Sequence, residues 1–490
     1  MVVEHVVMMP FMAQGHLIPF AALAELLSEL HSLKITLVNT PHNASKLRSM
    51  MNPKAAGAID VAELPFSSAD HGLPPDAENT DALPYPLILR LFEASETLEP
   101  AFESLISDVA RKDGRLPLCI VADVFCGWTV LVAERLGIHH VVFTTCGAFG
   151  TLGYASTWLH LPHVGTDADE FPVPGMPGVR LHRTQLASHL RVADGKDGWS
   201  IFLQKHISLS MHRSRGDMLC NTVAELEPDG IRLLQTMTGS RVLPIGPLLP
   251  LSLFSENWAR ERGGKPLGIS AESCIAWLDT QPLRSVLYVS FGSQNTVSRW
   301  QLKELALGLE ASGAGFIWVV RPPLEFPMTA EFRSEWLPEG FEERVKDRGL
   351  IVKGWAPQLA ILSHKGTGAF LSHCGWNSVL ESLSQGVPLI GWPMAGEQFY
   401  NTIMLGDEKV GVCVEVGRGK EVGVDREKVA RVVAEVVKGE KGAEMRRKAA
   451  EMREDLRKGM AEEESGGGSS LRALDEFVAS IVSPHVHFVA

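Results

Sequence analysis

The chain of 490 residues lacks several features that define large protein classes. No apolar run approaches the roughly 18 residues that a membrane-spanning helix requires. Residues 1–16 have no basic segment, and Gln14, Gly15 and His16 interrupt their apolar run, unlike a signal peptide. A formal net charge of −12 argues against nucleic acids and anionic membranes as partners. We therefore expect a monomeric, cytoplasmic protein that binds small molecules without stable membrane insertion.

Cysteine is scarce, and the motifs of common cofactor sites are missing. The seven cysteines are an odd number without a Cys-x-x-Cys pair, which is typical of apolar core residues in a reducing compartment. No Gly-x-Gly-x-x-Gly follows an expected strand, and no P-loop, nucleophile-elbow or metal-ligand pattern occurs. These absences exclude the usual dinucleotide and P-loop sites, and we expect no metal or other cofactor.

What the sequence does contain is a regular alternation of apolar strands and amphipathic helices. In the first half, strands are predicted at 5–11, 35–40, 118–125 and 139–145, and a helix at 17–30. A strand, a helix and a strand in succession form a parallel unit with helices on the faces of the sheet. The predicted fold class is therefore α/β.

The alternation stops and then starts again, which divides the chain into two parts. Residues 247–270 follow neither a helical nor a strand pattern, and strands are predicted again at 285–293, 315–321 and 349–357. Two doubly wound, Rossmann-like domains that face a common cleft account for this arrangement. Ligands of such sheets bind beyond the carboxyl ends of the strands.

The most informative stretch is residues 355–398. An apolar strand at 369–372 runs into a polar turn at 373–377 and then into a helix that ends before Gly386. The first turn of a helix has unpaired backbone N–H groups and the positive end of the helix dipole. It therefore attracts anions, and phosphate is the commonest of them.

The polar residues of this turn each have two interpretations. His373 and Asn377 can donate hydrogen bonds to phosphate oxygens, or they can hold the turn in place. Ser378 and Glu381 have the spacing of a capping box, in which both side chains pair with backbone N–H groups at the start of the helix. The residues alone leave these alternatives open.

Two tryptophans in the stretch are either core residues or walls of a binding site. Trp355 follows Gly354 at the end of a strand, where an indole can form a flat wall against a nucleotide base. Trp376 lies inside the polar turn itself.

A second set of polar residues lies in the first half. His16 follows the first strand in a loop, and a histidine with an ordinary pKa of about 6.5 suits general base catalysis at neutral pH. Asp123 interrupts a buried strand, where a carboxylate needs a partner, and it is the candidate to orient His16. Alternatively, Asp123 caps the helix that starts near Gly127. Thr144 and Thr145 end another strand and can face the same cleft.

The stretch 355–398 resembles the signature box of the plant family 1 UDP-sugar glycosyltransferases, which have the GT-B fold. The matching segments are WAPQ, HCGWNS, a glutamate, GVP, WP and a final acidic residue with glutamine. The likeness extends over most of the chain, through MAQGH, FPVPGMP, NTVAELEP, PIGPL, WLDTQP, VLYVSFGS and LPEGFEERV. This signal is far more specific than any single motif.

The resemblance implies that the two halves of the chain bind different substrates. Residues 1–246 would bind the acceptor, 247–270 would link the domains, and 271–470 would bind the UDP-sugar. Residues 471–490 would form a final helix that packs back on the first domain. The implied UDP-sugar-binding residues are Thr145, Gly292, Ser293, Trp355, Ala356, Gln358, His373, Trp376, Asn377, Ser378, Glu381, Glu397 and Gln398.

Within this set the resemblance implies separate roles for each part of the donor. Trp355 would stack on uracil, and Glu381 would bind the ribose hydroxyls. His373, Asn377 and Ser378 would bind the diphosphate, together with the backbone after Phe291 at Gly292 and Ser293. Trp376, Glu397 and Gln398 would hold the sugar, and Thr145 would contact its far edge. At Trp376 and Gln398 the chain resembles enzymes that use glucose.

The reaction implied is an inverting, metal-independent transfer of glucose from UDP-glucose to a hydroxyl of a small apolar acceptor, which gives a β-glucoside. The acceptor would be of the flavonoid, phenolic or terpenoid class. His16 would remove the hydroxyl proton, and Asp123 would stabilise the resulting imidazolium. The acceptor pocket is expected to contain apolar residues near the cleft, namely Met12, Phe125, Phe149 and Trp158.

Other functions remain compatible with the same motifs. A different GT-B enzyme, such as a lipid glycosyltransferase or a UDP-sugar epimerase, would also bind a nucleotide sugar. A non-catalytic UDP-sugar-binding protein is a further alternative. His16 and Asp123 argue against the latter because binding alone requires neither residue.

Overall fold

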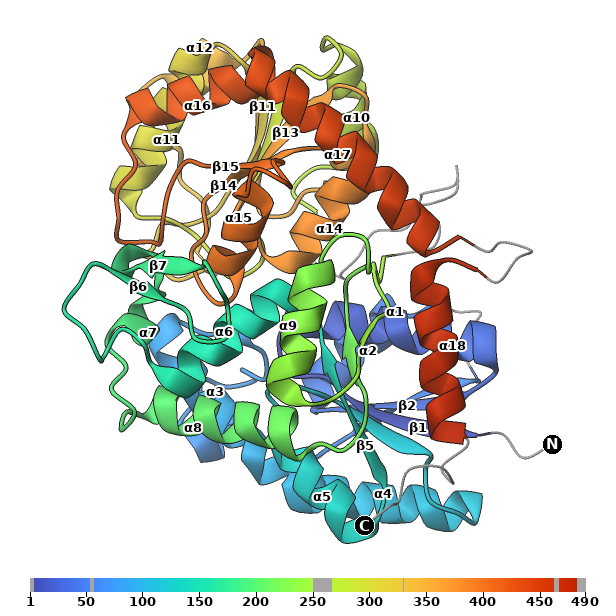
Figure 1. The fold of residues 1–490 in the computed structure, drawn as a ribbon. Helices are drawn as coiled ribbons and strands as arrows, with labels where there is room; N and C mark the ends of the chain where they lie inside the picture. Colours follow the sequence, from blue (N-terminus) through green and yellow to red (C-terminus); the bar gives the residue numbers. More distant parts are fainter. Residues whose placement is uncertain (1–3, 53–56, 250–266, 329, 462–466, 483–490) are drawn as a thin grey trace.

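The computed structural model describes residues 4–52, 57–249, 267–328, 330–461 and 467–482. It consists of two lobes, each built on a parallel β-sheet with helices on its faces (Figure 1). This arrangement confirms the predicted α/β class with two doubly wound units.

The first lobe contains a seven-stranded sheet in the order β3–β2–β1–β4–β5–β8–β9. Its strands are β1 (His5–Met9), β2 (Lys34–Asn39), β3 (Ile59–Glu63), β4 (Cys119–Asp123), β5 (His139–Thr144), β8 (Met218–Cys220) and β9 (Val242–Pro244). The helices of this lobe are α1 (Gln14–His31), α2 (Pro41–Met50), α3 (Tyr85–Ser95), α4 (Glu99–Asp113), α5 (Trp128–Leu136), α6 (Ala148–His160), α7 (Ser188–Arg191), α8 (Gly198–Ser208) and α9 (Pro228–Thr238). A small antiparallel hairpin follows α6 and consists of β6 (Glu170–Pro172) and β7 (Arg180–His182).

The second lobe contains a six-stranded sheet in the order β12–β11–β10–β13–β14–β15. Its strands are β10 (Val286–Ser290), β11 (Gly315–Val320), β12 (Gly349–Lys353), β13 (Thr367–Ser372), β14 (Leu389–Gly391) and β15 (Cys413–Glu415). Its helices are α10 (Ala271–Asp279), α11 (Arg299–Ser312), α12 (Phe341–Val345), α13 (Gln358–Ser363), α14 (Trp376–Ser384), α15 (Gln398–Gly406), α16 (Arg426–Lys438) and α17 (Glu440–Gly459).

Both sheets have a switch point near their centre. In the first sheet the chain builds β2 and β3 on one side of β1 and then returns to place β4 on the other side. The second sheet repeats this with β10 between β11 and β13. A crevice opens at the carboxyl ends of two strands whose connections run in opposite directions. Each lobe therefore offers a binding crevice, one beside β1 and β4 and the other beside β10 and β13.

The helices form where apolar residues recur at the helical period. In α16 the buried residues are Val429, Val432, Val433, Val436 and Val437, which is the spacing of one helix face. The side chain of Asp425 accepts a hydrogen bond from a backbone N–H in the first turn and so starts the helix. The buried stripe packs against α11. Throughout the described ranges, no helix combines the length and the apolar character that crossing a bilayer would require.

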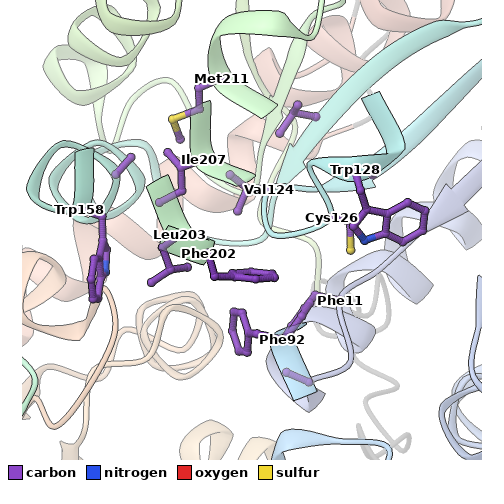
Figure 2. Packing of buried hydrophobic residues seen from close by; sticks show 14 of the residues in the cluster. Phe11, Phe92, Val124, Cys126, Trp128, Trp158, Phe202, Leu203, Ile207 and Met211 are labelled. Carbon is purple, nitrogen blue, oxygen red and sulfur yellow. The ribbon is translucent and has the colours of Figure 1, made fainter. Parts of the chain in front are cut away.

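The core lies on both faces of each sheet. In the first lobe, a cluster on one face draws side chains from α3, α5, α6 and α8 (Figure 2). The rings of Phe11, Phe92 and Phe202 gather at its centre, and the ring centroids of Phe11 and Phe92 are 4.3 Å apart. All seven cysteines are free thiols, and every one except Cys146 is buried, as expected for small core residues.

The chain passes between the lobes near residue 248 and again near its end. Leu248 packs in the core of the first lobe, whereas Leu249 packs in the core of the second. Most of the expected linker at 247–270 lies outside the described residues. After α17, helix α18 (Ser469–Val482) returns to the first lobe and packs against β9 (Figure 1). The domain limits given above stay predictions.

Replacing Phe477 in α18 with alanine is expected to lower the free energy of unfolding by about 3–5 kcal/mol. The ring is completely buried against the first sheet, and its removal leaves a cavity. Val482 on the same helix is 46% exposed, and its replacement by alanine should change this free energy by less than about 0.5 kcal/mol. Urea unfolding of both variants tests the prediction, and equal small effects would contradict it.

Candidate active site

A cavity of about 350 Å³ is lined by residues from the carboxyl ends of both sheets. His16 lines it from the first lobe, shortly after β1. The predicted donor residues all line the same cavity, namely Thr145, Gly292, Ser293, Trp355, Ala356, Gln358, His373, Trp376, Asn377, Ser378, Glu381, Glu397 and Gln398. The cavity therefore joins the two switch points, as the fold rule for doubly wound sheets predicts.

His16 and Asp123 form a hydrogen-bonded pair at the switch point of the first sheet. His16 lies in the first turn of α1, and Asp123 is the last residue of β4. Nδ1 of His16 lies 2.6 Å from Oδ2 of Asp123, and the hydroxyl of Thr145 lies 3.4 Å from the same nitrogen. Oδ1 of Asp123 accepts the backbone N–H of Phe125 at 3.0 Å. Both carboxylate oxygens are thus engaged, and Nε2 of His16 is left for the cavity.

This geometry decides between the two interpretations of Asp123. Helix α5 begins at Trp128, and its N-terminal residue Gly127 has no side-chain cap. Asp123 is only 1% exposed and does not line the cavity, since it lies behind the imidazole. The capping alternative is therefore wrong, and Asp123 orients His16.

The surroundings of His16 raise its pKa. Burial is the largest single influence and lowers the pKa, because it disfavours the charged ring. The charge and the hydrogen bond of Asp123, with the charge of Glu397, outweigh burial and bring the pKa above the ordinary 6.5. The ring is therefore a stronger base than free imidazole, and it accepts a proton more readily.

His373, the first residue after β13, is enclosed by glycine backbone. A Cβ on Gly292 would lie 2.5 Å from Cε1 of His373, and a Cβ on Gly375 would lie 2.5 Å from its Nε2. Any side chain at these two positions would collide with the imidazole. The next residue, Cys374, has a φ of 60°, which is unusual for a residue other than glycine. The turn thus holds the ring tightly between β10 and α14.

Two polar atoms of this turn lack a partner. Nδ1 of His373 and Oδ1 of Asn377 are buried and form no hydrogen bond with the part of the chain that the structure describes. Buried polar atoms are nearly always paired, so these two indicate where a polar ligand binds. Burial, reinforced by the charges of Arg321 and Lys420, lowers the pKa of His373 to about 3. The ring is neutral at physiological pH and offers one N–H donor.

Glu381 belongs to a hydrogen-bonded network on one wall of the cavity. Its Oε2 accepts the amide N–H of Gln358 at 2.6 Å, and the same amide lies 3.2 Å from the hydroxyl of Ser378. Helix α14 starts after Gly375 without a side-chain cap, and Glu381 is in its second turn. The alternative interpretation of Ser378 and Glu381 as a capping box is therefore wrong, because the helix begins too early for it.

The two tryptophans occupy different environments. Trp355 follows β12, is half-buried and lines the cavity, and the guanidinium of Arg321 lies 5.4 Å from its ring centroid. Trp376 is almost fully buried, and its indole N–H donates to the carbonyl of Asn221 at 2.6 Å. Trp355 can thus form a wall of the binding site. Trp376 also lines the cavity, and its hydrogen bond to Asn221 joins the two lobes.

The end of the signature stretch holds a loop in place. Oε1 of Gln398 accepts the backbone N–H groups of Met394 and Ala395, each at 3.0 Å. Burial raises the pKa of Glu397, the neighbouring residue in the lining. Over the described ranges, no three His, Cys, Asp or Glu side chains gather closely enough to hold a metal ion.

The acceptor side of the cavity differs from the prediction. Of the four predicted pocket residues only Phe125 lines the cavity. Met12 and Trp158 are core residues that are 1% and 0% exposed, and Phe149 packs against two core clusters. The prediction failed there because an apolar residue near a cleft has the same sequence signature as a core residue. The aromatic lining comes instead from residues without a local signal, namely Phe11, Tyr85, Phe92, Tyr154 and Trp199.

Comparison with known proteins agrees with this geometry. Residues 261–446 match the family described as UDP-glucoronosyl and UDP-glucosyl transferase, and residues 3–160 match the one described as glycosyltransferase, N-terminal domain. The chain is 43% identical over 484 residues to UDP-glycosyltransferase 92A1 of Arabidopsis thaliana, and the match covers 96% of each chain. The chain belongs to the plant family 1 UDP-dependent glycosyltransferases.

Further relatives of this glycosyltransferase support the same assignment. It is 45% identical to crocetin glucosyltransferase 3 of Crocus sativus, over 97% of this chain and 98% of the other. The solved structure of Phytolacca americana UGT2 with UDP-2fluoro-glucose and pterostilbene aligns with a TM-score of 0.77 and 30% identity, over 98% and 100% of the two chains. The two lobes are thus those of a GT-B glycosyltransferase, and the chain is an enzyme of this class.

Replacing Gly292 with alanine is expected to weaken UDP binding by about tenfold or more, because the new Cβ would displace His373. Gly239 is the matched control. It has a φ of 70°, close to the 74° of Gly292, but a Cβ there would meet nothing within 4 Å. Both variants carry about 1–2 kcal/mol of left-handed strain. Calorimetric titration with UDP should separate them, and equal affinities would contradict the role of this close contact.

Proposed function

We propose that this enzyme transfers glucose from UDP-glucose to a hydroxyl of a small, largely apolar acceptor, with inversion at the anomeric carbon and without a bound metal ion. The observation that carries the proposal is the position of His16. Its ring lines the cavity that also contains the polar turn of His373 and Asn377, and Asp123 supports it at 2.6 Å. A base and an anion site thus meet in one cavity.

In the proposed reaction, Nε2 of His16 accepts the proton of the acceptor hydroxyl. The oxygen forms a bond to the anomeric carbon from the side opposite the diphosphate. The bond from that carbon to the diphosphate oxygen breaks, and UDP leaves with the electron pair. Asp123 stabilises the imidazolium, and the N–H groups at the start of α14 with His373 stabilise the charge on the departing diphosphate.

Glucose is the proposed donor sugar for two reasons. Trp376 and Gln398 occupy the positions at which glucose-using members of the family have these residues. Relatives such as crocetin glucosyltransferase 3 are named as glucosyltransferases. The hydrogen bonds of Gln398 to the loop before α15 hold this end of the signature stretch in place for the sugar.

The acceptor side supports a flat, aromatic or otherwise conjugated acceptor. From His16 a series of rings extends along the cavity, with centroid distances of 5.5 Å to Phe125, 5.4 Å from Phe125 to Phe92 and 5.3 Å from Phe92 to Trp199. All four residues line the cavity. Aromatic walls favour ligands that can stack or present their edges. A phenolic acceptor such as a flavonoid would place its ring here and its hydroxyl at His16.

The proposal is tested by incubating the purified enzyme with UDP-glucose and a set of phenolic and terpenoid compounds, with mass spectrometry as the readout. A product heavier by one glucosyl group and UDP release that depends on the acceptor are expected. Conversion of UDP-glucose without an acceptor would indicate an epimerase. Binding of UDP-glucose without any turnover would indicate a non-catalytic protein.

Replacing His16 with alanine is expected to lower kcat by about 10²–10⁴-fold, because the general base is lost. UDP affinity should stay within about twofold, since the donor residues are unchanged. His160, exposed at the end of α6, is the control, and its alanine variant should keep full activity. Near-normal turnover of the His16 variant would remove this residue from the mechanism.

The pH dependence of kcat/KM offers a separate test. His16 must be neutral to accept a proton, so activity should fall as the pH drops through its raised pKa, above 6.5. In Asp123→Asn the charge that raises this pKa is lost while burial still lowers it. The acid limb should therefore move to lower pH, with a lower maximal rate. An unchanged limb with reduced stability would show that Asp123 is only structural.

A further inference from the structure

Arg321 is the only lysine or arginine among the described residues that line the cavity. It directly follows β11, which lies between β10 and β12 in the sheet. Its neighbours at the carboxyl edge are thus the segment after β10, with Ser293, and the segment after β12, with Trp355. The signature stretch begins only at Trp355, so Arg321 lies outside it.

The guanidinium of Arg321 contacts both neighbouring segments. One of its terminal nitrogens donates to the carbonyl of Ser293 at 2.6 Å, and its central carbon lies 5.4 Å from the ring centroid of Trp355. These contacts hold the side chain at the rim of the donor half of the cavity. They occupy one N–H group and one face of the guanidinium, although it has five N–H donors.

The charge of Arg321 is not balanced by an acid. Among the described residues no carboxylate forms an ion pair with Arg321, whose close contacts are the Ser293 carbonyl and the Trp355 ring. Asp81 acts on it from the other lobe, but Asp81 is already paired with Lys46 at 3.1 Å. Burial lowers the pKa of Arg321 to about 10, so the group still carries its charge at neutral pH. An unpaired, partly buried cation is costly unless a ligand supplies the missing charge.

The other polar groups of the donor half do not supply a positive charge. His373 is neutral, since its pKa is near 3, and Asn377 and Ser378 are uncharged. Lys420 lowers the pKa of His373 from some distance, but its Nζ lies over the ring of Tyr85 and the residue is not in the lining. A nucleotide diphosphate carries at least two negative charges, and charge-assisted hydrogen bonds are the strong ones.

We propose that Arg321 binds the diphosphate of the nucleotide sugar and supplies the positive charge of the donor site, while its contacts with Ser293 and Trp355 hold it in position. The proposal rests on the proposed function, because it takes a UDP-sugar as the ligand. It adds a donor-binding residue from outside the signature stretch. The N–H groups left free by Ser293 would pair with phosphate oxygens beside the start of α14.

The test compares UDP with uridine, which lacks the diphosphate. In Arg321→Gln the side-chain amide can still donate to the Ser293 carbonyl, but the charge is gone. We expect UDP to bind about 10- to 100-fold more weakly to this variant, and uridine to bind within about twofold of wild type. Titration calorimetry measures both. An equal loss for UDP and uridine would overturn the proposal, since Arg321 would then only support Trp355, and so would no loss at all.

Two further variants make the result specific. Arg321→Lys keeps the charge and should recover much of the UDP affinity that the glutamine variant loses. Arg348→Gln is the matched control, because Arg348 donates to the backbone carbonyls of Ala314 at 2.9 Å and Glu310 at 2.7 Å, near the amino end of β11. It should lower stability without changing the ratio of UDP to uridine affinity. A lysine variant as weak as the glutamine variant would contradict the proposal.

The wild-type enzyme separates failure of this proposal from failure of the proposed function. If wild type binds UDP but the Arg321 variants bind it equally well, Arg321 does not bind the diphosphate, and the transferase function stands. If wild type binds neither UDP nor UDP-glucose, the proposed function itself is wrong. Retained uridine binding by Arg321→Gln also shows that the variant is folded.

Discussion

At the cavity, hydrogen bonds join the turn after β13 in the second lobe to backbone carbonyls of the first lobe. Trp376 donates to the carbonyl of Asn221 at 2.6 Å, and Asn377 donates to the carbonyl of Gly15 at 3.0 Å. Since Gly15 directly precedes His16, the second bond also places the base relative to the anion site. Glycines allow this close approach, because a Cβ on Gly153 would lie 2.2 Å from the ring of Tyr400. A reaction that uses groups from both lobes thus depends on these hydrogen bonds and on close packing between the lobes.

The two histidines of the cavity have pKa values that their surroundings shift in opposite directions. His16 has a buried carboxylate behind it, which raises its pKa, whereas burial and nearby cations lower the pKa of His373. One ring is suited to accept a proton, and the other is suited to donate a hydrogen bond without gaining charge. We infer that the positive charge for a diphosphate then comes from a third side chain, Arg321, which lines the same cavity.

Sequence reasoning found residues that line the cavity where they lie in one short stretch or at the end of a strand. The proposed donor residues come mainly from one strand, turn and helix, so their spacing is visible without the fold. His16 and Asp123 were recognisable because each is a polar residue beside an apolar strand, although 107 positions separate them. Arg321 is likewise a polar residue at the end of an apolar strand, 315–321, but it lies outside the signature stretch. The capping-box alternative is excluded only by the structure, in which α14 starts after Gly375 without a side-chain cap.

By itself the sequence determined the α/β class and identified His16 and the polar residues of 355–398 that line the cavity, because periodicity and local motifs encode them. Only the tertiary structure decided which apolar residues form the aromatic wall of the cavity. Phe92 and Trp199 reach it from α3 and α8, whereas Met12 and Trp158 are core residues despite an equally apolar character. A core position and an apolar pocket both remove an apolar side chain from water. Hydrophobicity therefore does not distinguish between them. Which of the two a residue joins depends on how distant helices pack, and no local pattern records that.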